Sequence, residues 1–203
     1  GWNFNQNISN LPSTLTHLMF GHNFSMQVEK LNLPALTHLT FGFWFNNPVE
    51  NLNLPSLTHL SFGHHFAQSI DKLHAPCITH LFLGYNFQQK YEIPSSVKYL
   101  RLCANNSYII NSLPNSIEEL EFGDYFNMDI NNLPTSIKKL LFNRNSCFNK
   151  ELDNLPKFIE ELKLGNAYKK KINNIPQNLK KIICKENYPH LSDFTTCRIT
   201  TYF

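Results

Sequence analysis

Apolar residues recur along the chain in a six-residue pattern, Leu-x-x-Leu-x-Phe, which first occurs at Leu15, Leu18 and Phe20. The last two apolar residues of each copy are separated by one variable residue, which is typical of a short β-strand with one buried face. The pattern returns about every 21 residues, the spacing of a repeat protein. We therefore predict nine short strands that stack in parallel, so that neighbouring repeats complete one core. Their apolar pairs are Leu18/Phe20, Leu39/Phe41, Leu60/Phe62, Leu81/Leu83, Leu100/Leu102, Leu120/Phe122, Leu140/Phe142, Leu162/Leu164 and Ile182/Cys184.

The segments that connect these strands are regular too. Prolines recur at intervals of 18 to 22 residues, and in most repeats a glycine directly follows the strand. An aromatic and two aliphatic residues precede most of the prolines, as in Phe126, Ile130, Leu133 and Pro134. We expect turns, 3-10 and polyproline II conformation here, because the segments are short and rich in Asn and Pro. The glycines are expected to allow positive φ at the strand exits, and the aromatic rings to form one continuous internal ladder.

These elements predict a single domain whose fold class is an α/β-type repeat solenoid, mostly β. Because the pattern is close to the LxxLxL signature, we expect a leucine-rich-repeat-like arc with one short parallel strand per repeat and the turns on its convex side. Residues 1–187 are expected to hold nine repeats. The first is truncated at its start, since Gly1 to Phe4 aligns with Gly21 to Phe24, and we expect the chain to be part of a longer protein. Residues 188–203 leave the pattern and are predicted to cap the core.

The composition bears on the partners and the cell compartment that we expect for this protein. The chain has 203 residues, of which 42% are hydrophobic and 16% charged, with a formal net charge of +3. Such a small charge gives no indication of nucleic acid or an anionic membrane as partner. No apolar run approaches the roughly 20 residues that span a bilayer. Five cysteines without a CxxC spacing favour a reducing compartment, the cytosol or the nucleus, and of these we expect the cytoplasm.

Motifs for catalysis and cofactor binding are missing from the sequence. It has no phosphate-binding glycine loop, nucleophile elbow, HExxH motif or zinc-type Cys/His spacing. The adjacent carboxylates Glu118/Glu119 and Glu160/Glu161 would suit glycoside hydrolysis, but neighbouring columns of lysine neutralise them. We therefore predict a protein that is not an enzyme, with no catalytic residue, cofactor or metal site.

The block LPSTLTHLMFGHNF that begins at Leu11 resembles the FNIP repeat, known from social amoebae and giant amoeba viruses. The resemblance covers residues 1–188. Cys103 replaces the glycine and Asn106 the phenylalanine of the sixth unit, and Asn143 replaces the glycine of the eighth. These departures affect local loop geometry and not the fold. Proteins with this repeat often carry an N-terminal F-box, so the resemblance implies a role in choosing substrates for a ubiquitin-ligase complex, in the host cytoplasm if the protein is viral.

Side chains between the apolar positions are expected to point outward, on the concave side of the arc. In the first four strands His17, His38, His59 and His80 form one column. Imidazole is a common zinc ligand, but side chains about 4.8 Å apart along a line do not converge on a tetrahedral centre. We interpret the column as a Thr–His surface ladder, in which repulsion disfavours charging all four histidines together. We hypothesise that acidification towards about pH 5 loosens this half.

The last five strands carry charges whose sign alternates from strand to strand, and this face is either self-neutralising or a charge-patterned docking surface. Between the two halves, Phe82, Tyr99 and Arg101 are of types enriched at binding hot spots. Phe43 and Trp44 are expected at the rim. The predicted binding residues are Phe82, Tyr99, Arg101, His17, His38, His59, His80, Glu119, Glu121, Lys139, Glu161 and Lys163.

The leading functional hypothesis is a scaffold that binds another protein through the concave face. A carbohydrate-binding module or an enzyme with its site in the concave groove is the alternative. A self-associating structural array is a third hypothesis, because an uncapped strand edge exposes backbone and core. The regular, duplicated surface favours the scaffold.

Overall fold

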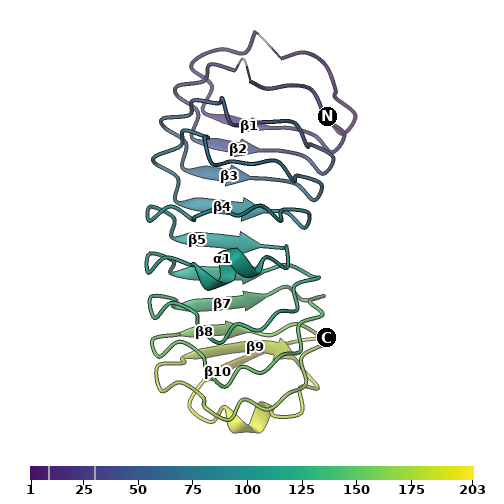
Figure 1. The fold of residues 1–203 in the computed structure, drawn as a ribbon. Helices are drawn as coiled ribbons and strands as arrows, with labels where there is room; N and C mark the ends of the chain where they lie inside the picture. The colour runs from purple at the N-terminus through teal and green to yellow at the C-terminus, as the bar shows by residue number, and fades with distance from the viewer. Residues whose placement is uncertain (9, 30) are drawn as a thin grey trace.

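Ten parallel strands form a single sheet in a computed structural model that describes residues 1–8, 10–29 and 31–203. The strands pair in chain order, β1 with β2 through to β9 with β10, and Figure 1 shows them stacked in one column with a return segment leaving each strand. The predicted leucine-rich-repeat-like solenoid is confirmed. The strands are β1 His17–Met19, β2 His38–Thr40, β3 His59–Ser61, β4 His80–Leu83, β5 Tyr99–Leu102, β6 Glu119–Phe122, β7 Lys139–Phe142, β8 Glu161–Lys163, β9 Lys181–Lys185 and β10 Arg198–Tyr202.

The strand register follows the repeat without slippage. Leu18 pairs with Leu39 in β1 and β2, and Leu39 pairs with Leu60 in β2 and β3. Because side chains alternate across a strand, every apolar position of the six-residue pattern lies on the same face. These residues are buried from the second repeat onward, with Leu36 and Leu57 fully covered. One continuous core therefore runs along the whole stack.

The glycines that follow the strands do not have the predicted positive φ; among the described residues no glycine has one. The structure gives a different reason for them. A Cβ atom on Gly42 would lie 1.9 Å from the carbonyl oxygen of Gly21, and one on Gly63 would lie 2.0 Å from the carbonyl oxygen of Gly42. Successive repeats thus approach each other so closely at this corner that a side chain has no room.

The internal aromatic ladder is interrupted, contrary to the prediction that it is continuous. Phe24, Phe45, Phe66 and Phe87 stack with ring centroids 6.0 to 6.2 Å apart. In the sixth repeat the buried Asn106 occupies the next position. Farther along, rings stack again from Phe126 to Phe148 and Tyr168.

A short helix replaces the missing ring. The side chain of Asn106 accepts a hydrogen bond from the Ile109 backbone N–H (3.2 Å) and so caps helix α1, Ser107–Asn111. Its amide donates to the carbonyl of Gln89 at 2.9 Å, and α1 buries Ile109 and Ile110 in the core. The expected turns connect the other repeats, so this helix is a departure from the prediction. The one 3-10 helix among the described residues is η1, Leu191–Asp193, outside the repeats.

Residues 188–203, which we expected to cap the core, also contribute a strand. β10 pairs in parallel with β9, and Arg198 lies opposite Lys181. The hydroxyl of Tyr202 donates to the carbonyl of Leu164 at 2.6 Å, which ties the segment to the eighth repeat. β10 is the last strand in the sheet order, so no described residue pairs with its outer edge.

Two further observations concern the cysteines and membrane-spanning helices. All five cysteines are free thiols, of which Cys184 is buried in the core. Among the described residues, no helix is both long and apolar enough to cross a membrane.

Candidate functional site

The outward side chains of β1–β9, here called the strand face, form columns that run along the stack. In the first four strands the predicted histidine column is a continuous ring stack. His17 and His38 lie 4.2 Å apart between centroids, His38 and His59 4.1 Å, and His59 and His80 3.9 Å. The rings are within 14° of parallel. Tyr99 continues the column at 5.6 Å.

Threonine hydroxyls contact the ring nitrogens of this stack. Thr37 Oγ1 donates to the backbone carbonyl of Thr16 at 2.9 Å and lies 2.9 Å from His38 Nδ1. Thr58 and His59 repeat the arrangement. Each of these hydroxyls therefore links an imidazole ring to the backbone of the preceding repeat.

Charging the stacked rings is unfavourable. Burial, followed by the proximity of His17 and His80, lowers the pKa of His38. Burial, followed by His80, His38 and His17, lowers the pKa of His59.

The geometry of the histidine stack does not suit a chelated metal ion, because the rings lie along a line. The described part of the chain holds no group of three or more His, Cys, Asp or Glu side chains that could hold a metal ion.

The charged columns of the last five strands form ion pairs between neighbouring strands. Lys139 Nζ lies 2.8 Å from Glu119 Oε2, and Lys181 Nζ lies 3.0 Å from Glu161 Oε1. In the next column Glu118 is flanked by Lys138 at 2.8 Å and Lys98 at 3.7 Å. These carboxylates are engaged by lysines, so the adjacent acids do not form a paired general acid and base. Of the other predicted residues here, Lys163 is half-buried on β8, opposite Leu141 and Ile183.

Phe82, Tyr99 and Arg101 do come together between the two halves. The rings of Phe82 and Tyr99 are 5.2 Å apart at an angle of 40°, and the Arg101 guanidinium carbon lies 5.8 Å from the Phe82 centroid. Glu121 accepts a hydrogen bond from the Tyr99 hydroxyl and lies 3.3 Å from Arg101 Nε. The second contact is an ion pair and not an aligned hydrogen bond, because the buried Nε has no hydrogen-bond partner.

Burial and the bond to Glu121 both hold Tyr99 in its protonated form. Desolvation is the larger cause, and together with that hydrogen bond it raises the pKa of Tyr99. Burial likewise raises the pKa of the Cys103 thiol. Tyr99 is therefore a rigid donor and Cys103 a protonated thiol at neutral pH, and neither is a prepared nucleophile.

A second aromatic column, here called the rim stack, lies one residue beyond the glycines and was only partly anticipated from Phe43 and Trp44. Neighbouring rings are nearly parallel, with centroid distances of 4.5 to 5.0 Å. Ala104 holds this position in the sixth repeat, and there Tyr85 meets Tyr125 edge-on at 5.2 Å. Aligning the residues that follow each glycine would have revealed the column, which consists of Trp2, His22, Phe43, His64 and Tyr85.

A hollow of about 280 Å³, here called the junction groove, lies between the rim stack and the strand face. Its lining combines strand-face residues, rim residues and the edges of two core residues, and Gly84, the residue that follows β4, contributes no side chain. Tyr99 contacts the ring of Phe82 but is not part of the lining. The lining residues are Phe43, Ser61, Phe62, His64, Phe82, Leu83, Gly84, Tyr85, Arg101 and Cys103.

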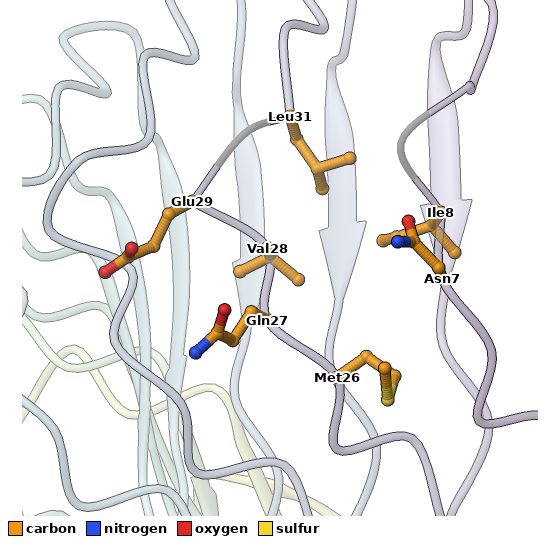
Figure 2. Close-up of a pocket in the computed structure, with 7 residues that line it drawn as sticks. All are labelled: Asn7, Ile8, Met26, Gln27, Val28, Glu29 and Leu31. Carbon is orange, nitrogen blue, oxygen red and sulfur yellow. The ribbon is translucent and has the colours of Figure 1, made fainter.

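Another hollow, of about 410 Å³, lies between the return segments of the first two repeats (Figure 2). Among the described residues that line it, Glu29 is the one charged side chain. The lining residues are Asn7, Ile8, Met26, Gln27, Val28, Glu29 and Leu31.

Comparisons with known proteins agree with this architecture. Residues 4–44, 105–145 and 148–184 match the family pattern described as FNIP Repeat. The crystal structure of CroV588, described as a novel circular LRR protein, is similar to this chain with 30% sequence identity and a TM-score of 0.67. The match covers 98% of this chain, which spans 39% of the length of CroV588.

Other comparisons add little. A leucine-rich repeat protein from Bacteroides ovatus ATCC 8483 aligns with 96% of this chain and 77% of its own at 12% identity, with a TM-score of 0.21 that supports no argument. None of the curated proteins matches the chain.

Proposed function

The chain belongs to the FNIP-repeat family, and we propose that it is a protein-binding scaffold whose contact surface is the strand face. It is a repeat protein of the FNIP and leucine-rich-repeat type. Such stacks are rigid, and they present a long array of side chains whose spacing is set by the backbone. A protein that binds a partner without converting it chemically needs only such a surface.

The cluster of Phe82, Tyr99 and Arg101 is the observation that supports this proposal most strongly. Aromatic residues and arginine dominate the energetics of protein interfaces. Phe82 is partly exposed on the strand face, while its neighbours Leu81 and Leu83 are buried in the core. The ring is thus held on a rigid strand, and little conformational entropy is lost when a partner covers it.

The alternative of a carbohydrate-binding module has weaker support from the geometry. A sugar ring packs against the open face of an aromatic side chain. Within the rim stack and the histidine stack most ring faces are covered by the next ring, as with Phe43 between His22 and His64. Only ring edges are then available along most of each stack. We therefore do not propose sugar binding or an enzymatic activity.

The biological setting that we propose follows from family membership. In it the array is the recognition part of a longer cytoplasmic protein, and an N-terminal F-box would deliver the bound partner to a ubiquitin-ligase complex. Co-purification of the full-length gene product with ubiquitin-ligase subunits tests this role. Its failure would remove the ubiquitin-ligase role while leaving the scaffold proposal intact.

Affinity capture with paired variants tests the scaffold proposal itself. Folded chain is used as bait in lysate of the source cell, alongside the double variant Phe82→Ala/Arg101→Ala. The matched control is Lys157→Ala/Phe158→Ala, which removes a cation and an exposed aromatic ring outside the strands. We expect the first variant to lose a specific protein that the wild type and the control retain. Identical protein lists from all three baits would contradict the proposal.

A further inference from the structure

The junction groove differs from the rest of the strand face in both shape and chemistry. Aromatic rings form most of its walls, with Phe82 on one side and Phe43 and Tyr85 on the other. Ser61, the last residue of β3, has a small side chain and leaves space at its end of the groove. The walls are therefore suited to an apolar, flat group, and the serine hydroxyl is available for a polar contact.

The groove is large enough for a single bulky side chain. It measures about 280 Å³, at the lower end of the range of about 300–1,000 Å³ enclosed by sites for drug-sized ligands. A hollow of this size on an open face suits one bulky anchor residue, the usual way in which a peptide or protein partner gains affinity from a pocket.

Arg101 gives the groove its charge. It is the one lining residue with a formal charge, because the pKa of His64 is lowered by burial and by His65. Glu121, which pairs with Arg101 Nε, is not part of the lining, and its other oxygen accepts the Tyr99 hydroxyl. A guanidinium has five N–H donors, and the contacts with Glu121 and with the Cys103 thiol engage only part of them. Among the described residues no second carboxylate pairs with Arg101, so the groove favours an anionic group at this end.

We propose that the junction groove binds an extended peptide segment of the partner protein, inserting an aromatic side chain whose neighbouring Asp or Glu pairs with Arg101. The inference rests on the proposed scaffold function and specifies its contact chemistry. The ring packs between Phe82 and the rim residues Phe43 and Tyr85, and the carboxylate meets the outward edge of the guanidinium. The apolar contact supplies affinity, and the ion pair selects for acidic neighbours.

Selection from a displayed library of random linear peptides, with the folded chain as bait, tests this assignment. We expect the enriched peptides to share an aromatic residue within two positions of Asp or Glu. A synthetic peptide of the leading sequence is then titrated by fluorescence anisotropy against the wild type and four variants. Ser61→Phe fills the groove and Arg101→Gln removes its charge, while Ile183→Phe and Lys181→Gln make the same changes on the face of β9. Circular dichroism confirms that each variant is folded.

The groove variants are expected to weaken peptide binding by about tenfold or more, the effect of a hot-spot residue, and the β9 controls to leave it unchanged. Replacing the acidic residue of the peptide with Lys should weaken binding to the wild type but not to Arg101→Gln. No enrichment, or enrichment without the aromatic–acidic pair, would overturn the inference. Binding that is lost only in the β9 variants would also overturn it while leaving the scaffold function standing.

Discussion

A Cβ atom added to Gly42 would lie 1.9 Å from the carbonyl oxygen of Gly21 in the preceding repeat. Backbone atoms cannot move away from such a contact as the end of a flexible side chain can. From Gly21 to Gly84 the glycine is therefore a packing requirement, whereas Cys103 and Asn143 hold this position in later repeats. The lack of side chains on these glycines also leaves the space between the strand face and the rim stack in which the junction groove lies.

Gly42→Ala is expected to destabilise the chain by about 2 kcal/mol or more, as overpacking in a rigid region does. Urea unfolding followed by circular dichroism measures the change. Gly1→Ala is the matched control, because a Cβ atom on Gly1 meets nothing within 4 Å. Equal stability of both variants would show that the repeats can separate at this corner at little cost.

Asn106→Ala is expected to destabilise the chain by about 1–3 kcal/mol, because α1 loses its N-cap and buried backbone groups lose their partners. The side chain caps Ile109 N–H and donates to Phe87 and Gln89 carbonyls. Asn111→Ala, an exposed change at the end of the same helix, serves as the control and should have little effect. A neutral result for Asn106→Ala would mean that α1 forms without this side chain.

Stability should decrease as pH falls below the ordinary histidine range. The pKa values of His38 and His59 are lowered in the folded chain, so the unfolded chain binds protons more readily. Their contribution is fully present above about pH 6.5 and is lost as pH falls through the lower folded-state values. Unfolding free energies at about pH 7 and pH 5 measure the loss.

The double variant His38→Gln/His59→Gln should show a smaller loss between these two pH values than the wild type. His74→Gln, at an exposed position on a return segment, should lose as much as the wild type. An unchanged pH dependence in the double variant would exclude the histidine stack as its source.

Lys139→Glu should destabilise the charged half modestly. The change places a carboxylate between Glu119, now 2.8 Å from the lysine, and Glu161, which lies opposite in the sheet. Exposed pairs contribute about 0–1 kcal/mol, so the expected cost is about 1 kcal/mol at low ionic strength and less at high salt. Thermal melts at two salt concentrations check this. A cost that does not depend on salt would indicate a packing defect instead of charge repulsion.

The apolar pattern was sufficient to predict the repeat fold, because a period of two within each strand and a fixed spacing between strands define which residues are buried. The register of Leu18 opposite Leu39 follows directly from that spacing. What the pattern did not reveal depends on contacts between repeats. The reason for Gly42 is a neighbouring carbonyl, and α1 forms because Asn106 satisfies backbone groups of the previous repeat.

The candidate site was predicted in part. Phe82, Tyr99 and Arg101 were expected to be neighbours because their columns are adjacent, and the structure places them together. The groove itself was not anticipated. It requires the rim residues His64 and Tyr85, which lie beyond the strand, where the alternation of inward and outward side chains no longer indicates direction.

The central claim, that a protein partner contacts the strand face, is tested most directly by site-specific photo-cross-linking. Benzoylphenylalanine is placed either at Thr40, on the strand face of β2, or at the exposed Asn131 on a return segment. After irradiation in lysate of the source cell, the account predicts a discrete cross-linked protein from position 40 and none from position 131. A cross-link to the same protein from position 131 alone would contradict it.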